Sequence, residues 1–139
     1  MQGRSLAFLG AAALSTAFSV QTAFADVALP ATHHSGDITY LSGGIGSDQS
    51  SALKNLMHRY PLTLEFVGRH GDYLADVPVR IADMHGNTVL DAQSDGPFML
   101  LRLPDGRYEV TASYDGSTVR RNVNIDSGTH AHDLFVWPT

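Results

Sequence analysis

Residues 77–114 read VPVRIADMHGNTVLDAQSDGPFMLLRLPDGRYEVTASY, and this stretch decides the fold. Turn-forming groups interrupt it at 84–87, 95–97 and 104–106, and an Asp-Gly pair follows at 115–116. Glycine and asparagine accept the positive φ of tight reversals, and proline presets φ at the first turn position. We therefore predict β-strands separated by turns, with a bulged hairpin at 104–106 and a two-residue hairpin at 115–116.

The predicted strands alternate apolar and polar side chains, as strands with one buried face do. Val77, Val79 and Ile81 share one face of the first strand, and Tyr108 and Val110 share one face of a later strand. Strands interrupted about every eight to twelve residues are typical of an antiparallel sandwich or barrel rather than of alternating strands and helices.

Further strands are expected at 62–67, 118–125 and 131–137, which brings the total to about seven. In a regular strand, Arg121 would lie on the same face as Val119, Val123 and Ile125, and its guanidinium would then be buried. We expect a bulge or a place at the rim of the sheet to keep this charge out of the core, the alternative being a buried pair.

One helix is predicted at about 48–60. Its apolar residues recur at i, i+3 and i+4, so that one face must pack on the sheet. Ser47 or Asp48 can cap its start, and Pro61 ends it because the proline ring clashes with a continuing helix. Residues 40–46 allow a short strand, but three glycines in four residues favour a loop.

The first 25 residues have the pattern of a cleaved secretory signal. Arg4 supplies the positive start, residues 6–20 are apolar, and Ala23-Phe24-Ala25 is a small-x-small cleavage site. The apolar run is shorter than the roughly 20 residues of a membrane-spanning helix. We expect a signal at 1–25, a flexible N-terminal arm at 26–39 and one β-domain at 40–139, the alternative being that the apolar run is a helix of the fold.

Composition narrows the classes of partner. Removing Arg4 leaves 8 of the 9 basic residues against 14 acidic ones, so the mature chain carries 8 − 14 = −6 with histidine neutral. This acidity argues against nucleic acid and anionic lipid surfaces as partners. The chain has no cysteine, so an exported domain must be held by its core alone. The signal sequence is typical of bacterial proteins that are exported to the periplasm, so we expect that location.

Residues 75–125 resemble the carboxypeptidase regulatory-like domains, which are transthyretin-like (prealbumin-like). The shared pattern is V-x-V, then glycine, D-G-x-F, L-P-x-G-x-Y-x-V-x-A and glycine. It falls here on Val77, Val79, Gly86, Asp95, Gly96, Phe98, Leu103, Pro104, Gly106, Tyr108, Val110, Ala112 and Gly116. The resemblance covers about half of the mature chain and implies an all-β, seven-stranded antiparallel Greek-key sandwich, here with one short N-terminal helix. The whole mature chain also looks like small exported bacterial proteins of this class.

The matching residues form turns and core, so the resemblance implies no catalytic residue. The related hydroxyisourate hydrolases end in Tyr-Arg-Gly-Ser, whereas this chain ends in Phe-Val-Trp-Pro-Thr. No Gly-x-Ser-x-Gly motif or phosphate-cradling loop is present in the sequence. We therefore expect no enzymatic activity. Most aromatic residues should be core, with Trp137 the one that stays partly exposed.

Histidine is the one unusual functional residue type, with seven in the chain. His130 and His132 would share a face on a strand, so one Zn²⁺ or Cu²⁺ ion could contact both, with His33 or His34 completing the site. The alternative is that these histidines bind no metal and are ordinary surface or packing residues. Two hypotheses follow. The first is a non-catalytic periplasmic module that binds or scaffolds a protein, peptide or envelope glycan without a cofactor, and the second is a histidine-based metal-binding protein.

Overall fold

The fold is known from a computed structural model, which describes residues 29–126 and 128–138. The expected signal at 1–25 and its cleavage site lie outside the described residues. No helix in the described ranges is long and apolar enough to cross a membrane.

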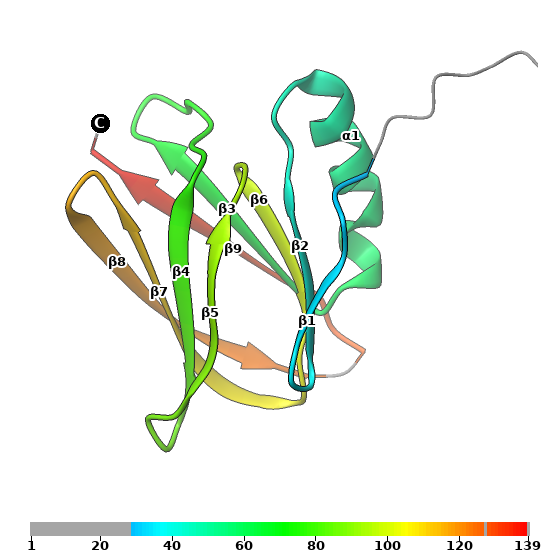
Figure 1. Cartoon of the computed structure of the whole chain (residues 1–139), viewed down its shortest axis with the longest axis vertical. Helices are drawn as coiled ribbons and strands as arrows, with labels where there is room; N and C mark the ends of the chain where they lie inside the picture. The colour runs from blue at the N-terminus through cyan, green and yellow to red at the C-terminus, as the bar shows by residue number, and fades with distance from the viewer. Residues whose placement is uncertain (1–28, 127, 139) are drawn as a thin grey trace, which may run out of the picture.

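Two β-sheets and one short α-helix make up the described chain (Figure 1). The five-stranded sheet has the spatial order β1 (His33–Ser35), β2 (Ile38–Gly43), β6 (Phe98–Arg102), β3 (Leu62–Gly68) and β9 (Ala131–Trp137). The four-stranded sheet has the order β5 (Thr88–Ser94), β4 (Val77–Asp83), β7 (Gly106–Tyr114) and β8 (Ser117–Ile125). Helix α1 (Ser47–Leu56) continues into a 3₁₀ turn, η1 (Met57–Arg59).

The main core lies between the two sheets. Each strand turns every second residue inward, as in Leu62, Leu64 and Phe66 of β3, and these side chains are fully buried. Phe66, Phe135 and Trp137 cluster there with ring centroids 5.5 to 6.1 Å apart, and the rings of Phe135 and Trp137 are stacked. Trp137 is fully buried and donates its indole N–H to the Ser117 carbonyl, so the expectation that it stays exposed is wrong.

A second, smaller core lies on the outer face of the five-stranded sheet, under α1 (Figure 1). Leu53 of the helix packs there with Leu41 of β2 and with Phe98 and Leu100 of β6. β6 is therefore buried on both faces, and this explains its unbroken apolar run from Phe98 to Leu101. The predicted packing of the helix on the sheet is confirmed.

The seven predicted strands correspond to β3 through β9, and β1 and β2 are two more. β2 occupies residues 38–43, so the loop expected at 40–46 is wrong for its first half, and part of the expected arm at 26–39 is a strand pair. The sheets are also not wholly antiparallel, because β3 and β9 pair in parallel. β3 and β9 are far apart in the sequence, so no single turn joins them and no local pattern indicates that they run in the same direction.

The turn-forming residues predicted where turns lie better than they predicted which strands the turns connect. Asp115 and Gly116 both have positive φ and join β7 to β8 in a two-residue hairpin, as expected. The bulged hairpin expected at 104–106 is wrong, because β6 and β7 belong to different sheets and this segment crosses between them. Gly96, in the crossing from β5 to β6, has little space, since a Cβ there would lie 2.4 Å from the Gly43 backbone.

Two local predictions have mixed outcomes. The N-cap of α1 is Gly46 with no side-chain hydrogen bond, so neither Ser47 nor Asp48 caps the helix. Arg121 lies at the rim, as one of the alternatives had it, and there is no bulge in its pairing with β7. Its guanidinium donates to the Leu134 carbonyl of β9 at 3.2 Å and lies over the Phe135 ring, so it bridges the edges of the two sheets.

Candidate functional site

The site begins with the carbonyl groups that the end of η1 leaves without helical partners. Tyr60 is extended (φ −122°, ψ 134°), as the residue before a proline usually is, so the helical hydrogen-bond pattern stops there. Three donors from elsewhere in the chain satisfy the released carbonyls. Arg102 donates to Arg59, His130 lies 2.7 Å from the Tyr60 oxygen, and the Ala131 amide donates to Pro61 at 2.9 Å.

These contacts bring three distant segments to one end of the five-stranded sheet, where β6 ends and β3 and β9 begin. A cleft of about 370 Å³ opens between them. The residues around it come from the end of η1, from the end of β6 with its following crossing, and from the segment before β9. They are His58, Arg59, Tyr60, Pro61, Arg102, Leu103, Asp105, Gly128, Thr129 and His130, hereafter the basic cleft.

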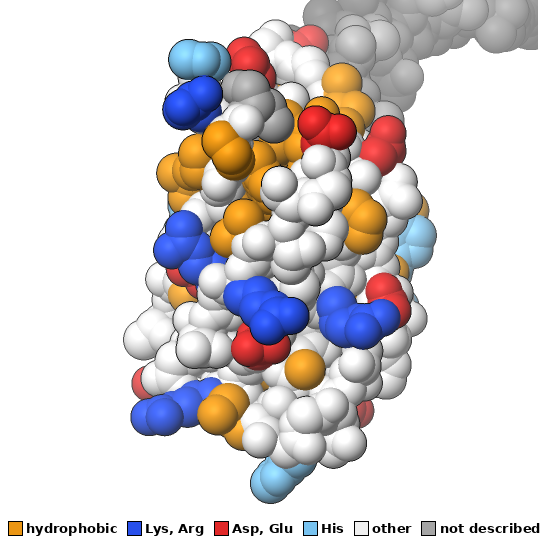
Figure 2. Space-filling view, turned by 90° about the vertical axis from the view of Figure 1, so that its left-hand side faces the viewer, with side chains coloured by type: hydrophobic (Ala, Val, Ile, Leu, Met, Phe, Trp, Pro, Cys, Tyr) orange, Lys and Arg blue, Asp and Glu red, His pale blue; other side chains and the backbone are white. Residues whose placement is uncertain are grey.

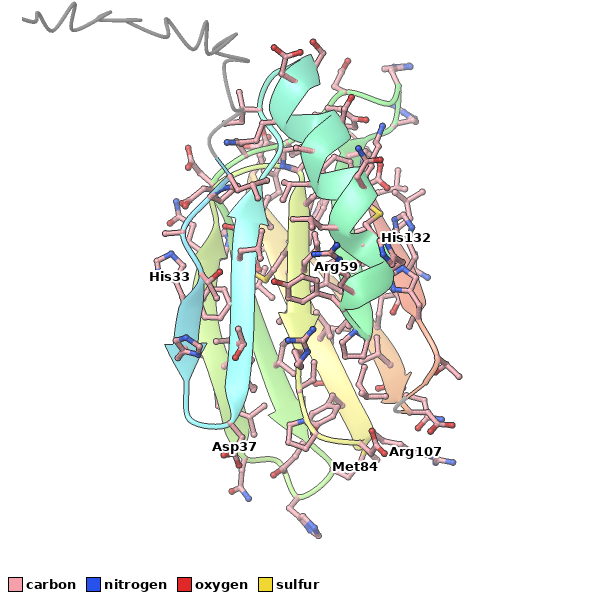
Figure 3. All side chains as sticks on the ribbon, turned by 90° about the vertical axis from the view of Figure 1, so that its right-hand side faces the viewer. His33, Asp37, Arg59, Met84, Arg107 and His132 are labelled. Carbon is pink, nitrogen blue, oxygen red and sulfur yellow. The ribbon has the colours of Figure 1, made fainter. Side chains whose placement is uncertain are left out.

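Positive charge gathers in the basic cleft although the whole chain carries −5. Arg59 and Arg102 are opposed by one acid, Asp105, which gives 2 − 1 = +1 with both histidines neutral. The Arg102 guanidinium carbon lies 4.9 Å from the centre of the Tyr60 ring, a cation–π arrangement that fixes its plane. Figure 3 shows Arg59 beside α1, on the side of the molecule that the helix covers.

The strands of the four-stranded sheet carry charges of both signs, which are Arg80, Arg107, Arg120 and Arg121 against Asp83, Asp91 and Glu109. Figure 2 views the side of the molecule that carries β7 and β8, and basic and acidic side chains are interspersed there. Arg80 of β4 and Asp91 of β5 form an exposed ion pair of 3.1 Å on this sheet. An exposed ion pair of this kind contributes little net electrostatic attraction for a charged ligand.

The four histidines proposed as metal ligands are divided between the two edges of the five-stranded sheet. His33 and His34 lie on β1, and His132 lies on β9, with four strand spacings of about 4.8 Å between them, roughly 19 Å. Figure 3 shows His33 and His132 on opposite sides of α1. One metal ion therefore cannot contact both pairs.

Each of these histidines has a neighbour of its own. His33 stacks on Tyr40 at 5.3 Å, and His34 lies 3.1 Å from the Thr39 hydroxyl. His132 pairs with Glu65 at 2.8 Å, whereas His130 precedes β9 and belongs to the basic cleft. Among the residues that the structure describes, no group of three or more metal-ligating side chains is close enough to hold an ion. The metal-binding alternative thus lacks a ligand set in this part of the chain.

The two groups with shifted pKa values lie outside the basic cleft. Asp83 accepts backbone hydrogen bonds from Asn87 and His85 in the β4–β5 turn, and these bonds lower the pKa of its carboxyl. Burial, followed by the charges of Asp83 and Asp105, raises the pKa of Tyr108, whose hydroxyl donates to the Pro104 carbonyl. Both arrangements stabilise turns rather than activate a reacting group.

Sequence reasoning selected only His130 from the basic cleft, and for a different role. Arg59, Tyr60 and Arg102 were not predicted as site residues because no motif links them and 42 positions separate Tyr60 from Arg102. The available clue was the Tyr60-Pro61 pair, since a proline directly after a helix leaves carbonyl groups that need donors.

No protein-family model matches the chain, and no curated protein sequence matches it.

Proposed function

We propose that this protein is a non-catalytic periplasmic module that binds or scaffolds an envelope component through the basic cleft. The component is a protein, a peptide or a glycan. The observation that carries this proposal is the basic cleft itself, where three segments far apart in sequence converge and two arginines line one cleft, Arg102 over the ring of Tyr60.

The construction of the basic cleft supports a binding role. Its walls are held by hydrogen bonds to the carbonyls of residues 59–61, so the cleft keeps its shape without a ligand. A preformed concave site with a few fixed polar groups loses less conformational entropy on binding than a flexible surface does.

Family membership is part of the same proposal. On this proposal, β3 through β9 would be the seven strands of a carboxypeptidase regulatory-like, Greek-key sandwich, and β1 with β2 would be an addition to that pattern. Gly86 and Gly116, two of the matching glycines, have the positive φ that their turns need. The residues that carry the resemblance form turns and core and imply no catalytic residue, which favours binding over chemistry here.

Export is proposed from the first 25 residues. Arg4, the apolar run and the Ala-x-Ala site fit a signal that is removed after Ala25. Mass spectrometry of the denatured protein recovered from a bacterial periplasm tests this point. A mass that begins at Asp26 is expected, and an intact N-terminus on the recovered protein would contradict export by cleavage.

The binding role is tested by site-specific photocrosslinking in the periplasm. A photoreactive amino acid replaces Thr129, exposed at the basic cleft, and in a matched strain it replaces Asn122, exposed on β8 of the other sheet. We expect discrete adducts from position 129 that are absent from position 122, with the partner identified by mass spectrometry.

Two results would contradict the proposal. One is the absence of adducts at 129, or the same adducts at both positions, which would mean that the basic cleft is not a specific binding site. The other is a turnover assay in which a chemical activity disappears on His130→Ala while the fold is retained, because that would make the protein an enzyme.

A further inference from the structure

We infer that the basic cleft binds a compact oxyanion, a carboxylate or a phosphate or sulfate group, held between Arg59 and Arg102. This inference rests on the proposed binding function and specifies the chemistry that the site recognises. The oxyanion would be one group of the larger envelope ligand.

Arg102 is arranged as a fixed anion receptor. Its guanidinium donates one N–H to the Arg59 carbonyl, and its carbon lies over the Tyr60 ring, 4.9 Å from the ring centre. A guanidinium has five N–H donors, so most of its donors remain for a ligand. The ring contact and the carbonyl contact together restrict the side chain, which lowers the entropy lost when a two-oxygen ligand docks.

Arg59 provides the second charge. Its backbone carbonyl holds Arg102, which keeps the two residues adjacent, and its exposed side chain lines the same cleft. Two arginines beside each other repel unless an anion lies between them. Asp105 offsets only one of the two charges, so the basic cleft retains a surplus that an oxyanion would neutralise.

The chemistry of the donors selects the ligand. Arginine matches the geometry of carboxylate and phosphate because its parallel N–H groups meet two oxygens at once. The cleft volume of about 370 Å³ accommodates such a group together with a neighbouring residue or sugar. A bulky cation or a purely apolar ligand would leave the surplus positive charge of the basic cleft without a counter-charge.

The test is an NMR titration of the purified protein with sodium acetate, inorganic phosphate and sulfate in separate arms. Sodium chloride holds the ionic strength constant, because exposed charges are screened by salt. We expect saturable shifts of the amides of residues 59–60, 102 and 128–130, with a dissociation constant on the order of millimolar for a free oxyanion at an exposed site. Whichever of acetate or phosphate binds more tightly identifies the source of the oxyanion.

Three variants test whether the oxyanion binds at the basic cleft. Arg59→Gln should weaken binding roughly fivefold to tenfold, because it removes one charge-assisted contact. Arg102→Lys keeps the charge but loses the planar fork, and it should weaken binding about threefold or more. Arg80→Gln, which removes an arginine paired with Asp91 on the other sheet, is the matched control and should leave binding unchanged.

The inference is overturned if no anion gives saturable shifts at the basic cleft, or if Arg80→Gln weakens binding as much as Arg59→Gln does. Circular dichroism confirms that each variant is folded; because Arg59 makes its structural contact through the backbone carbonyl, Arg59→Gln should keep the wild-type fold. Adducts at position 129 without oxyanion binding would leave the binding function in place and refute only the chemistry inferred here.

Discussion

Helix α1 and the sandwich should unfold as one cooperative unit, and Leu53→Ala tests this. Leu53 is fully buried against Leu41, Phe98 and Leu100. The substitution removes three carbon atoms worth about 0.8 kcal/mol each, or about 2.4 kcal/mol, and the cavity left behind raises the loss to about 3 kcal/mol. Alanine has a higher helix propensity than leucine, so a loss of stability cannot come from helix propensity and must come from lost packing.

Urea unfolding measures the effect with two independent probes. Trp137, the single tryptophan, reports the core between the sheets, and circular dichroism reports the backbone. With a urea dependence of about 1.5 kcal/mol per molar, a loss of about 3 kcal/mol lowers the midpoint by roughly 2 M in both signals. Leu56→Ala, on the same helix but only partly buried, is the control and should cost about 1 kcal/mol.

Two results would refute this reasoning. If the tryptophan midpoint stays at its wild-type value while the helical signal is lost at lower urea, α1 is a separate unit and not part of the cooperative fold. If Leu53→Ala and Leu56→Ala cost the same small amount, the core under the helix is not close-packed.

Three further predictions concern turns and buried groups. Gly96→Ala should cost about 1–3 kcal/mol by urea unfolding, because its Cβ would lie 2.4 Å from the Gly43 backbone; wild-type stability would contradict this close approach. The pKa of Asp83 is lowered from 3.8 by backbone hydrogen bonds, so its stabilisation is present above that pH and is lost as pH falls through the folded value. The stability gap between wild type and Asp83→Asn should therefore close in strong acid, and a gap independent of pH would be inconsistent. The pKa of Tyr108 is raised from 10.0, chiefly by burial, so its stabilisation is present below pH 10.0 and is lost as pH rises through the folded value. Tyr108→Phe should remove the highest-pH part of the tyrosinate absorbance curve, and an unchanged curve would argue against that burial.

The sequence predicted those parts of the fold that depend on local chemistry. The alternation in β4 and β7 and the Asp115-Gly116 turn act over a few residues, so their pattern is visible in one short stretch. The parallel pairing of β3 with β9 depends on contacts between the two ends of the domain, and no local pattern encodes it.

β2 was missed for a physical reason. The glycines at 43, 44 and 46 suggested a loop, yet Gly43 lies in the strand at a position where a Cβ would lie 2.7 Å from the side chains of Gln49 and Pro30. A glycine needed for close approach and a glycine needed for a turn look the same in sequence.

The candidate site was the least predictable part. Arg59, Arg102 and His130 meet because the carbonyls after η1 need donors, which is a consequence of tertiary structure. Histidine clustering drew attention to His130 and His132 as a pair, but the structure gives these two residues separate neighbours at 2.7 Å and 2.8 Å.

The central claim is that the arginines of the basic cleft hold the ligand, and one comparison tests it most directly. Photocrosslinking from position 129 is carried out in the periplasm with three backgrounds, which are wild type, Arg59→Gln and Arg80→Gln. We predict that Arg59→Gln abolishes or strongly reduces the adduct and that Arg80→Gln preserves it. An adduct of equal yield in all three would contradict the claim that the arginines of the basic cleft hold the ligand.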